Sequence, residues 1–476
     1  MRKNFRFPKI LSIALVFIIA VIFYACEDFS EVGTPPTLGT QIDFSRVVAI
    51  GNSITAGYQD GALFEGAQQY SYPNLIVQQI NKTFGTNITF VQPLIAEPGF
   101  GTRLRLTSLT PLQIQSQPVT GSPRNSAHAA PFNNLAVPGA ILFDMFDTTD
   151  YTAKAGPPRN NPFFQIVLRS RTLGPTMFHQ ARALNPTFVF FWMGNNDVLG
   201  YASSGGTRGT DPTGKLPTPE ATFQLLFRRS LDSLLRINTT VRIAVANIPD
   251  VTVIPFFTTV PWFVVDPNTG QPVRDAQGNL IPLTGVKGGT PRPLGPGDLV
   301  LLPASQLIST GYGLPPVPPF NQLPNAGKPL PDDVVLDASE VNIARTAIQR
   351  YNFIIDTVIA SSARAGRVVK VDIFSKLNEV KAQGLEIAGF KFTTDFITGG
   401  LFSLDGIHPS TRGHAIIANE FIKAINGKFG SNIPLIDVMS LPGIQLPTSG
   451  NIVGKYQIPK VPAEVWKNVV ELFTAR

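Results

Sequence analysis

The stretch Val47–Ser53, which reads VVAIGNS, decides the fold expected for this chain. Its first four residues form a short apolar run rich in β-branched side chains, which is typical of a buried strand that ends at Gly51. We expect the chain to turn into a helix there, so that Ser53 follows the carboxyl end of a strand, where open α/β sheets place their ligand crevices. The Ser53 amide would then be an unpaired donor at a helix N-terminus, which favours negative charge.

Further strand-like runs recur along the chain, with helix-like stretches between them. The runs expected to be strands are 47–50, 87–91, 187–193, 241–248 and 368–373. A helix is predicted from Thr218 to about Ile237, because Thr218 is a capping residue followed by proline. A second helix is predicted from Ser339 to about Ser362, where apolar residues form an amphipathic stripe. A third is predicted from Pro409 to Asn426, after the His408 loop. This alternation predicts an α/β fold with a central parallel sheet of about five strands.

Three more short blocks follow the serine and carry polar groups suited to one chemistry. They are NLAVPG at 134–139, GNND at 194–197 and DGIHP at 405–409. A serine hydroxyl is a poor nucleophile unless a base takes its proton, and His408 is the candidate base. Asp405 could hold the imidazole in one tautomer and stabilise its charged form. Gly139 lets its amide approach a ligand closely, and Asn196 could donate its side-chain amide to the same oxyanion.

Each block taken alone has a plainer interpretation. GNS at 51–53 and the Asp-Gly pair at 405–406 are ordinary turn sequences, and the Asn-Asn-Asp run at 195–197 could be a turn or a helix cap. Gly139 after Pro138 is by itself typical of a loop. The order of the four blocks, each after or near a strand-like run, favours the joint interpretation, which is attack of a serine on an ester carbonyl.

Other chemistries fit the sequence less well. The chain has no Ser-x-x-Lys motif, and Thr55 stands where the Gly-x-Ser-x-Gly elbow of α/β-hydrolases needs glycine. The other histidines, His128, His179 and His414, form no metal-ligand spacing with cysteine or glutamate. We therefore predict no metal and no cofactor, and we interpret His414 as structural or pocket-lining.

The four blocks resemble those of the SGNH hydrolases, also called GDSL esterases and lipases, a family named for a serine, a glycine, an asparagine and a histidine. The resemblance covers roughly 45–427, includes the NIPD segment at 247–250, and has long interruptions. It implies a flavodoxin-like, three-layer α/β/α fold. Asn52 departs from the pattern. The name GDSL implies Gly-Asp-Ser around the nucleophile, whereas this chain has Gly-Asn-Ser at 51–53.

By this resemblance, Ser53 is the nucleophile, His408 the base and Asp405 the third member of a catalytic triad. Gly139 and Asn196 would join the Ser53 amide in the oxyanion hole. The implied activity is that of a carboxylic ester hydrolase acting on a lipid, a short-chain ester or an acylated glycan. The alternatives are a carbohydrate O-acetylesterase or acyltransferase that uses the same residues, and a non-catalytic surface lipoprotein that binds a ligand.

The first 25 residues have the pattern of a targeting segment. Four basic residues precede an uncharged, mostly apolar stretch at 10–25, which is short for a membrane span and ends directly before Cys26, the only cysteine. This resembles a bacterial lipoprotein signal with Cys26 as the lipidated residue, although an uncleaved anchor is the alternative. We expect an extracytoplasmic protein that is lipid-anchored to a bacterial membrane, with the outer membrane or cell surface favoured.

Charge gives no indication of a nucleic-acid partner. Residues 1–25 hold four basic residues and no acidic one, so their removal lowers the formal net charge from +7 to +3. No basic run remains that would bind a phosphate backbone.

The motif blocks span most of the 476 residues, which favours one large domain. We predict a tether at 26–43, a hydrolase domain at 44–427 and a tail at 428–476 that packs on the domain or mediates association. Long insertions without regular structure are expected near 93–132, 203–215 and 255–331. We hypothesise that these insertions form a cap over Ser53 and set its acyl or leaving-group selectivity.

Overall fold

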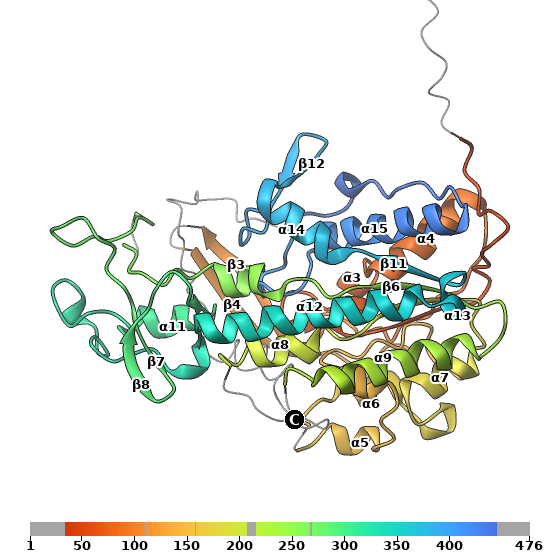
Figure 1. The fold of residues 1–476 in the computed structure, drawn as a ribbon, viewed down its shortest axis with the longest axis horizontal. Coiled ribbons are helices and arrows are strands. Elements are labelled where there is room, and N and C mark those ends of the chain that lie inside the picture. The colour runs from red at the N-terminus through yellow and green to blue at the C-terminus, as the bar shows by residue number, and fades with distance from the viewer. Residues whose placement is uncertain (1–33, 110–111, 158, 207–215, 267–268, 445–476) are drawn as a thin grey trace, which may run out of the picture.

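A four-stranded parallel sheet forms the centre of the molecule. The computed structural model describes residues 34–109, 112–157, 159–206, 216–266 and 269–444 (Figure 1). The sheet has the order β1-β5-β6-β11, with bounds Val47–Gly51, Phe188–Trp192, Arg242–Ala246 and Val368–Val371. Its strands are almost fully buried, which explains their nearly continuous apolar sequences. The predicted α/β class with a central parallel sheet is confirmed.

The strand predicted at 87–91 is wrong, and the sheet has four strands instead of about five. Residues 133–137 lie beside β1 in its place. The Ala49 N–H donates to Asn133 O (2.8 Å), and the Leu135 N–H donates to Ala49 O (2.9 Å). Residues 87–91 lie one step further out, because Val91 O accepts the Asn133 N–H (2.8 Å). The edge of the sheet beside β1 is therefore occupied by 133–137, the segment that leads to Gly139, and not by 87–91.

Helices cover both faces of the sheet and give the expected three layers (Figure 1). The helices α4 (Tyr72–Phe84), α14 (Ile373–Gln383) and α15 (Thr411–Phe429) lie on one side. The helices α8 (Asn196–Ala202), α9 (Glu220–Leu235) and α12 (Ala338–Ala360) lie on the other. The three predicted helices thus correspond to α9, α12 and α15.

The remaining α-helices and strands of the described chain are shorter or lie outside the central sheet. The helices are α2 (Ser53–Ala56), α3 (Glu65–Gln68), α5 (Tyr151–Lys154), α6 (Phe163–Leu168), α7 (Met177–Ala183), α10 (Pro255–Thr258), α11 (Ala304–Ser309) and α13 (Ser362–Ala365). The strands are β2 (Ala62–Leu63), β3 (Phe100–Leu109), β4 (Leu112–Thr120), β7 (Thr284–Lys287), β8 (Thr290–Pro293), β9 (Leu299–Val300), β10 (Val335–Leu336), β12 (Leu385–Ile387) and β13 (Phe390–Phe392). Among the described helices, none combines the length and the hydrophobicity that crossing a bilayer requires.

The segment 93–132 is not the irregular loop that was predicted. Its middle part, β3 and β4, forms a long antiparallel hairpin with β2 paired to β3, while 93–99 and 121–132 hold no helix or strand. The missed signal is an alternation of period two, since Leu104 is buried between two arginines and Ile114 between two glutamines. Cross-strand pairing along β3 and β4, with one irregularity between Leu106 and Ser108, makes this pattern regular structure.

The insertion at 255–331 also contains regular structure, and part of it belongs to the core. Val300, Leu301, Leu302 and Leu330 are fully buried in the same hydrophobic cluster as the central sheet. Of the predicted loop at 203–215, residues 207–215 lie outside the described residues. The described part of this insertion therefore shares the core of the central sheet, and folded elements lie between the motif blocks.

The start of the described chain pairs with the segment that follows α15. The Thr37 N–H donates to Asn432 O (3.3 Å), and the Asn432 N–H donates to Thr37 O (2.7 Å). The targeting segment, Cys26 and residues 445–476 of the tail lie outside the described residues, so lipidation stays a prediction.

Candidate active site

Ser53 lies at the turn from β1 into α2. The Asn52 side chain caps the helix, since its Oδ1 accepts the Ile54 N–H (3.3 Å). Ser53 is therefore the first helical residue, and its own N–H has no intrahelical acceptor. The side chain is buried, with 2% exposure. The sequence placed Ser53 at such a strand-to-helix turn, and the structure confirms the local geometry.

Asp405 and His408 lie together on the loop before α15. The Asp405 Oδ2 lies 2.8 Å from His408 Nδ1, and both residues are completely buried. The Asp405 Oδ1 accepts the N–H groups of Ile407 (3.0 Å) and His408 (2.9 Å). Burial by itself would raise the pKa of Asp405, but the charge of His408 and these hydrogen bonds lower it below its ordinary value. The carboxylate is thus held ionised against the imidazole.

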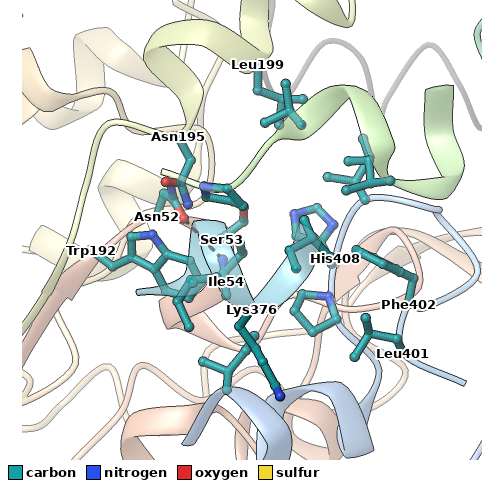
Figure 2. A pocket seen from close by; sticks show the side chains of 18 of the residues that line it. Asn52, Ser53, Ile54, Trp192, Asn195, Leu199, Lys376, Leu401, Phe402 and His408 are labelled. Carbon is teal, nitrogen blue, oxygen red and sulfur yellow. Dashed lines mark hydrogen bonds between the residues drawn. The ribbon is translucent and has the colours of Figure 1, made fainter. Parts of the chain in front are cut away.

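Ser53 and His408 approach one cavity from different elements (Figure 2). The cavity encloses about 90 Å³ and is lined by both side chains, together with Asn52, Asn195 and Asn196 at the same end. Because Nδ1 of His408 faces Asp405, its Nε2 is directed away from the carboxylate. A serine, a histidine and an aspartate from segments some 350 residues apart are thereby brought to one site.

The structure also joins the second and third sequence blocks. The Asn196 side-chain amide donates to Ala140 O (2.9 Å), directly after Gly139. Gly139 has φ of +77°, a left-handed conformation that glycine adopts without strain. Asn196 lies on the cavity wall, whereas Gly139 is not among the lining residues. The Asn196 amide has a second N–H, so the bond to Ala140 orients the group and leaves a donor.

Buried charges support the Gly139 segment, and sequence reasoning missed them. The Asp144 carboxylate pairs with Arg159, and its Oδ2 accepts the Ile141 N–H (2.8 Å). Asp197, the last residue of the third block, accepts the Leu142 N–H (2.9 Å). These contacts fix the backbone on the far side of Gly139. No spacing in the sequence indicated the partners, because the ion pair joins a 3-10 helix at Leu142–Met145 to a loop.

Tyr58 is a second missed neighbour of the site. Its ring centroid lies 4.7 Å from that of His408, and its hydroxyl donates to Gly61 O (2.6 Å). Burial and then the charge of Asp405 raise the pKa of Tyr58, so the phenol stays protonated. The Gly61 N–H in turn donates to Asp405 Oδ2 (3.1 Å). The turn after α2 therefore contacts both His408 and Asp405.

His414 does not compete with His408 as a base. It is buried to 1% exposure on α15, and it is not among the residues that line the cavity. Burial and then the charge of His408 lower the pKa of His414 to about 3. The ring is therefore neutral at physiological pH, which agrees with the structural role expected for it.

The fold and the site together define an α/β protein with a buried serine at the end of a central parallel strand. A family model of the GDSL-like lipase/acylhydrolases matches residues 47–421, and the chain belongs to this family of ester-hydrolysing enzymes. A comparison with curated proteins finds no match.

Solved structures that match the chain include two kinds of esterase. One is described as a GDSL-like lipase from Parabacteroides merdae, at 12% identity over 81% of this chain and 99% of that chain, with a TM-score of 0.30. Another is a family 3 carbohydrate esterase from Clostridium thermocellum, at 14% identity over 81% and 96%, with a TM-score of 0.30. A third is an active-site mutant of a family two carbohydrate esterase from the same organism, at 11% identity over 81% and 64%, with a TM-score of 0.31.

Proposed function

We propose that the protein is a serine ester hydrolase with Ser53 as nucleophile, His408 as general base and Asp405 as the group that orients and stabilises the imidazole. The observation that carries the proposal is that Ser53 and His408 line one cavity while His408 Nδ1 lies 2.8 Å from the buried carboxylate of Asp405. A nucleophile, a base and an orienting carboxylate in this relation are the parts of covalent acyl transfer.

In the proposed reaction, His408 takes the Ser53 proton while Oγ bonds to the ester carbonyl carbon. The oxyanion would be stabilised by the N–H groups of Ser53 and Gly139 and by the Asn196 amide. Collapse of the tetrahedral intermediate breaks the ester C–O bond, and His408 gives its proton to the leaving alcohol. Water then repeats the sequence on the acyl-enzyme and releases the carboxylic acid.

Hydrolysis of p-nitrophenyl esters by the full-length protein tests this proposal. Ser53→Ala should lower kcat by a factor of about 10⁴ or more, because loss of the nucleophile disables the whole unit. Ser230→Ala is the matched control, since Ser230 is an equally buried serine on α9 whose hydroxyl donates to Leu226 O. The control should keep its activity. Hydrolysis that survives in Ser53→Ala would contradict the assignment of Ser53 as nucleophile.

We also propose that the enzyme lies outside the cytoplasm, anchored through a lipid on Cys26. The basic residues, the apolar stretch and the single cysteine of the first 26 residues support this placement. Cys26→Ser should move the protein from the membrane fraction into the soluble fraction of fractionated cells. Equal membrane retention of both forms would instead favour an uncleaved anchor.

A further inference from the structure

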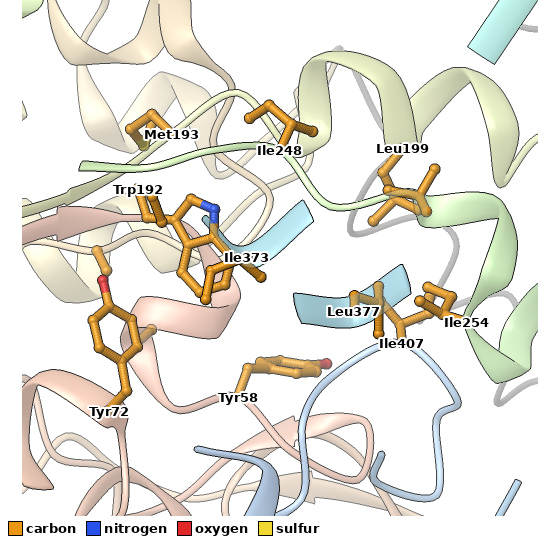
Figure 3. Packing of buried hydrophobic residues seen from close by; sticks show 14 of the residues in the cluster. Tyr58, Tyr72, Trp192, Met193, Leu199, Ile248, Ile254, Ile373, Leu377 and Ile407 are labelled. Carbon is orange, nitrogen blue, oxygen red and sulfur yellow. The ribbon is translucent and has the colours of Figure 1, made fainter. Parts of the chain in front are cut away.

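The cavity beside Ser53 is apolar beyond its catalytic end. Its lining includes Leu199 of α8, Ile254, three residues of α14 (Ile373, Leu377 and Val380) and Ile416 of α15. Each of these side chains is less than 10% exposed. Figure 3 shows Ile373 and Leu377 facing the same space as Ile254 and Ile407.

The charged residues of the wall are engaged elsewhere. Lys376 Nζ lies 3.2 Å from Glu379, and Glu420 lies 2.8 Å from Lys423, each pair on one helix. Both side chains are partly exposed, at 16% and 20%. Figure 2 shows the Lys376 amino group pointing away from Ser53. The cavity therefore offers hydrocarbon contact, with its polar groups concentrated around the nucleophile.

Such a space suits an alkyl chain better than water or a sugar. A cavity without polar partners does not hold water well, and one water needs about 10–15 Å³. The 90 Å³ here gives room for a row of several methylene groups. Each methylene that the wall covers should raise kcat/KM by a factor of about four, which corresponds to the transfer free energy of a buried CH₂. A sugar in this space would lose the hydrogen bonds of its hydroxyls.

We propose that this cavity binds the acyl chain of the substrate, and that the enzyme prefers esters of medium-length fatty acids, about six to eight carbons, over acetates. This inference rests on the proposed function, since it places the reacting carbonyl at Ser53. The residues that set the chain length are then Leu377 and Val380 of α14 and Ile416 of α15.

The insertion at 255–331 takes a different place from the cap that the sequence suggested. No described residue between 258 and 330 lines the cavity. Instead, Leu302 N–H donates to Phe256 O (2.8 Å), and Phe256 N–H donates to Gly406 O (3.0 Å). The insertion thus contacts the Asp405–His408 loop through Phe256 and Gly406. We therefore assign acyl selectivity to α14 and α15.

The test is the chain-length profile of the full-length protein on p-nitrophenyl esters from acetate to decanoate, at one fixed low detergent concentration. The wild type should show kcat/KM at least 100-fold higher for hexanoate or octanoate than for acetate. Leu377→Trp should lower the octanoate value at least tenfold and lower the ratio of the octanoate value to the acetate value. Leu377→Ala, which enlarges the space, should move the optimum to longer chains. Leu225→Trp, at a leucine on α9 that is 67% exposed, is the control and should keep the wild-type profile.

Labelling of Ser53 by diisopropyl fluorophosphate separates the two proposals. A labelled serine with acetate as the best substrate would overturn the acyl cavity and leave the serine hydrolase standing. The acyl cavity would also be overturned if both Leu377 variants fold, by circular dichroism, and keep the wild-type profile. Absence of both labelling and hydrolysis of any ester would overturn both proposals.

Discussion

The Asp405 carboxylate receives hydrogen bonds from two separate segments of the chain. His408 contributes Nδ1 and its backbone N–H, Ile407 contributes a backbone N–H, and Gly61 contributes another from the turn after α2. An ionised carboxylate can accept all of them, because it carries acceptor lone pairs on both oxygens. The side chain therefore fixes the position of the loop as well as the orientation of the imidazole.

Asp405→Asn should lower kcat by a factor of about 10⁴ while the protein stays folded. An amide of the same shape turns one acceptor into a donor, which favours the wrong imidazole tautomer and removes the charge that stabilises the imidazolium. Steady-state kinetics and circular dichroism measure the two effects. Asp395→Asn, at an exposed carboxylate that accepts the Thr393 hydroxyl, is the control and should keep full activity. A loss below tenfold in Asp405→Asn would remove Asp405 from the proposed mechanism.

Asp60 should make stability depend on pH. Its Oδ1 accepts the Leu404 N–H (2.9 Å). Burial raises the pKa of Asp60 to about 6, the Leu404 hydrogen bond opposes this, and the charge of Asp405 adds to it. The folded state therefore binds more protons than the unfolded state between about pH 4 and pH 6, so ionisation of Asp60 lowers the free energy of unfolding as pH rises through this window.

Asp60→Asn removes that titration and keeps an acceptor for Leu404. The wild type should gain stability relative to the variant when the pH falls from 7 to 4.5. Urea unfolding of both proteins at the two pH values measures the difference. An unchanged difference would mean that Asp60 does not titrate in this range.

At the scale of elements, a short turn couples the hairpin to the candidate catalytic loop. Gly61 O accepts the Thr102 N–H (3.0 Å) of β3, and Asp60 O accepts the Leu104 N–H (2.8 Å). The same turn donates from Gly61 to Asp405 and from Asp60 to Ser403 Oγ (3.1 Å). The hairpin that the sequence did not reveal thus holds one side of the His408 loop in place.

Gly61→Ala should disturb this coupling. Gly61 has φ of +75°, and a Cβ there would meet Thr102 O at 2.4 Å. We expect at least a tenfold loss of kcat, because a small displacement of catalytic groups is costly. Gly85→Ala is the matched control: Gly85 has φ of +64° and open space around it. Both variants should lose about 1–2 kcal/mol to backbone strain, and only Gly61→Ala should lose activity. Equal kinetics in the two variants would show that the turn does not position Asp405.

At the scale of the whole molecule, a buried lysine ties the 255–331 insertion to the rest of the domain. Lys287 of β7 is paired with Asp332 (2.5 Å) and with Glu340 of α12 (2.7 Å). It also donates to Gly205 O (3.0 Å), on the loop after α8. Three parts of the chain thus meet at one ammonium group, and neither Lys287 nor these partners line the Ser53 cavity.

Lys287→Met should lower the free energy of unfolding by about 1.5–3 kcal/mol, since it leaves the partly exposed carboxylates of Asp332 and Glu340 without their charged partner. The value of kcat should stay within about twofold of the wild type, because the cavity wall is untouched. Denaturant unfolding and ester kinetics provide the two readouts. Lys82→Met, at an exposed lysine on α4, should change neither. A large loss of kcat with little loss of stability would assign the lysine cluster to the site instead.

The sequence by itself determined the parts of this protein that depend on consecutive residues. The strands β1, β5, β6 and β11 and the helices α9, α12 and α15 follow from hydrophobic periods and capping residues, which are local properties. Placement of Ser53 at a strand end follows from the same run. Contact between Asp405 and His408 was also predictable, because three residues of one loop separate them.

Only the tertiary structure decided which distant segments meet. Residues 133–137 and 87–91 both suit an extended conformation, and the sheet edge beside β1 accepts one of them. The support of Asp405 by Gly61 and the enclosure of the Ser53 cavity by α14 and α15 join segments separated by hundreds of residues. Hydrophobic periodicity indicates which face of a helix or strand is buried. Packing in the folded protein selects the element that covers this face, and the elements selected in this way form the walls of the cavity.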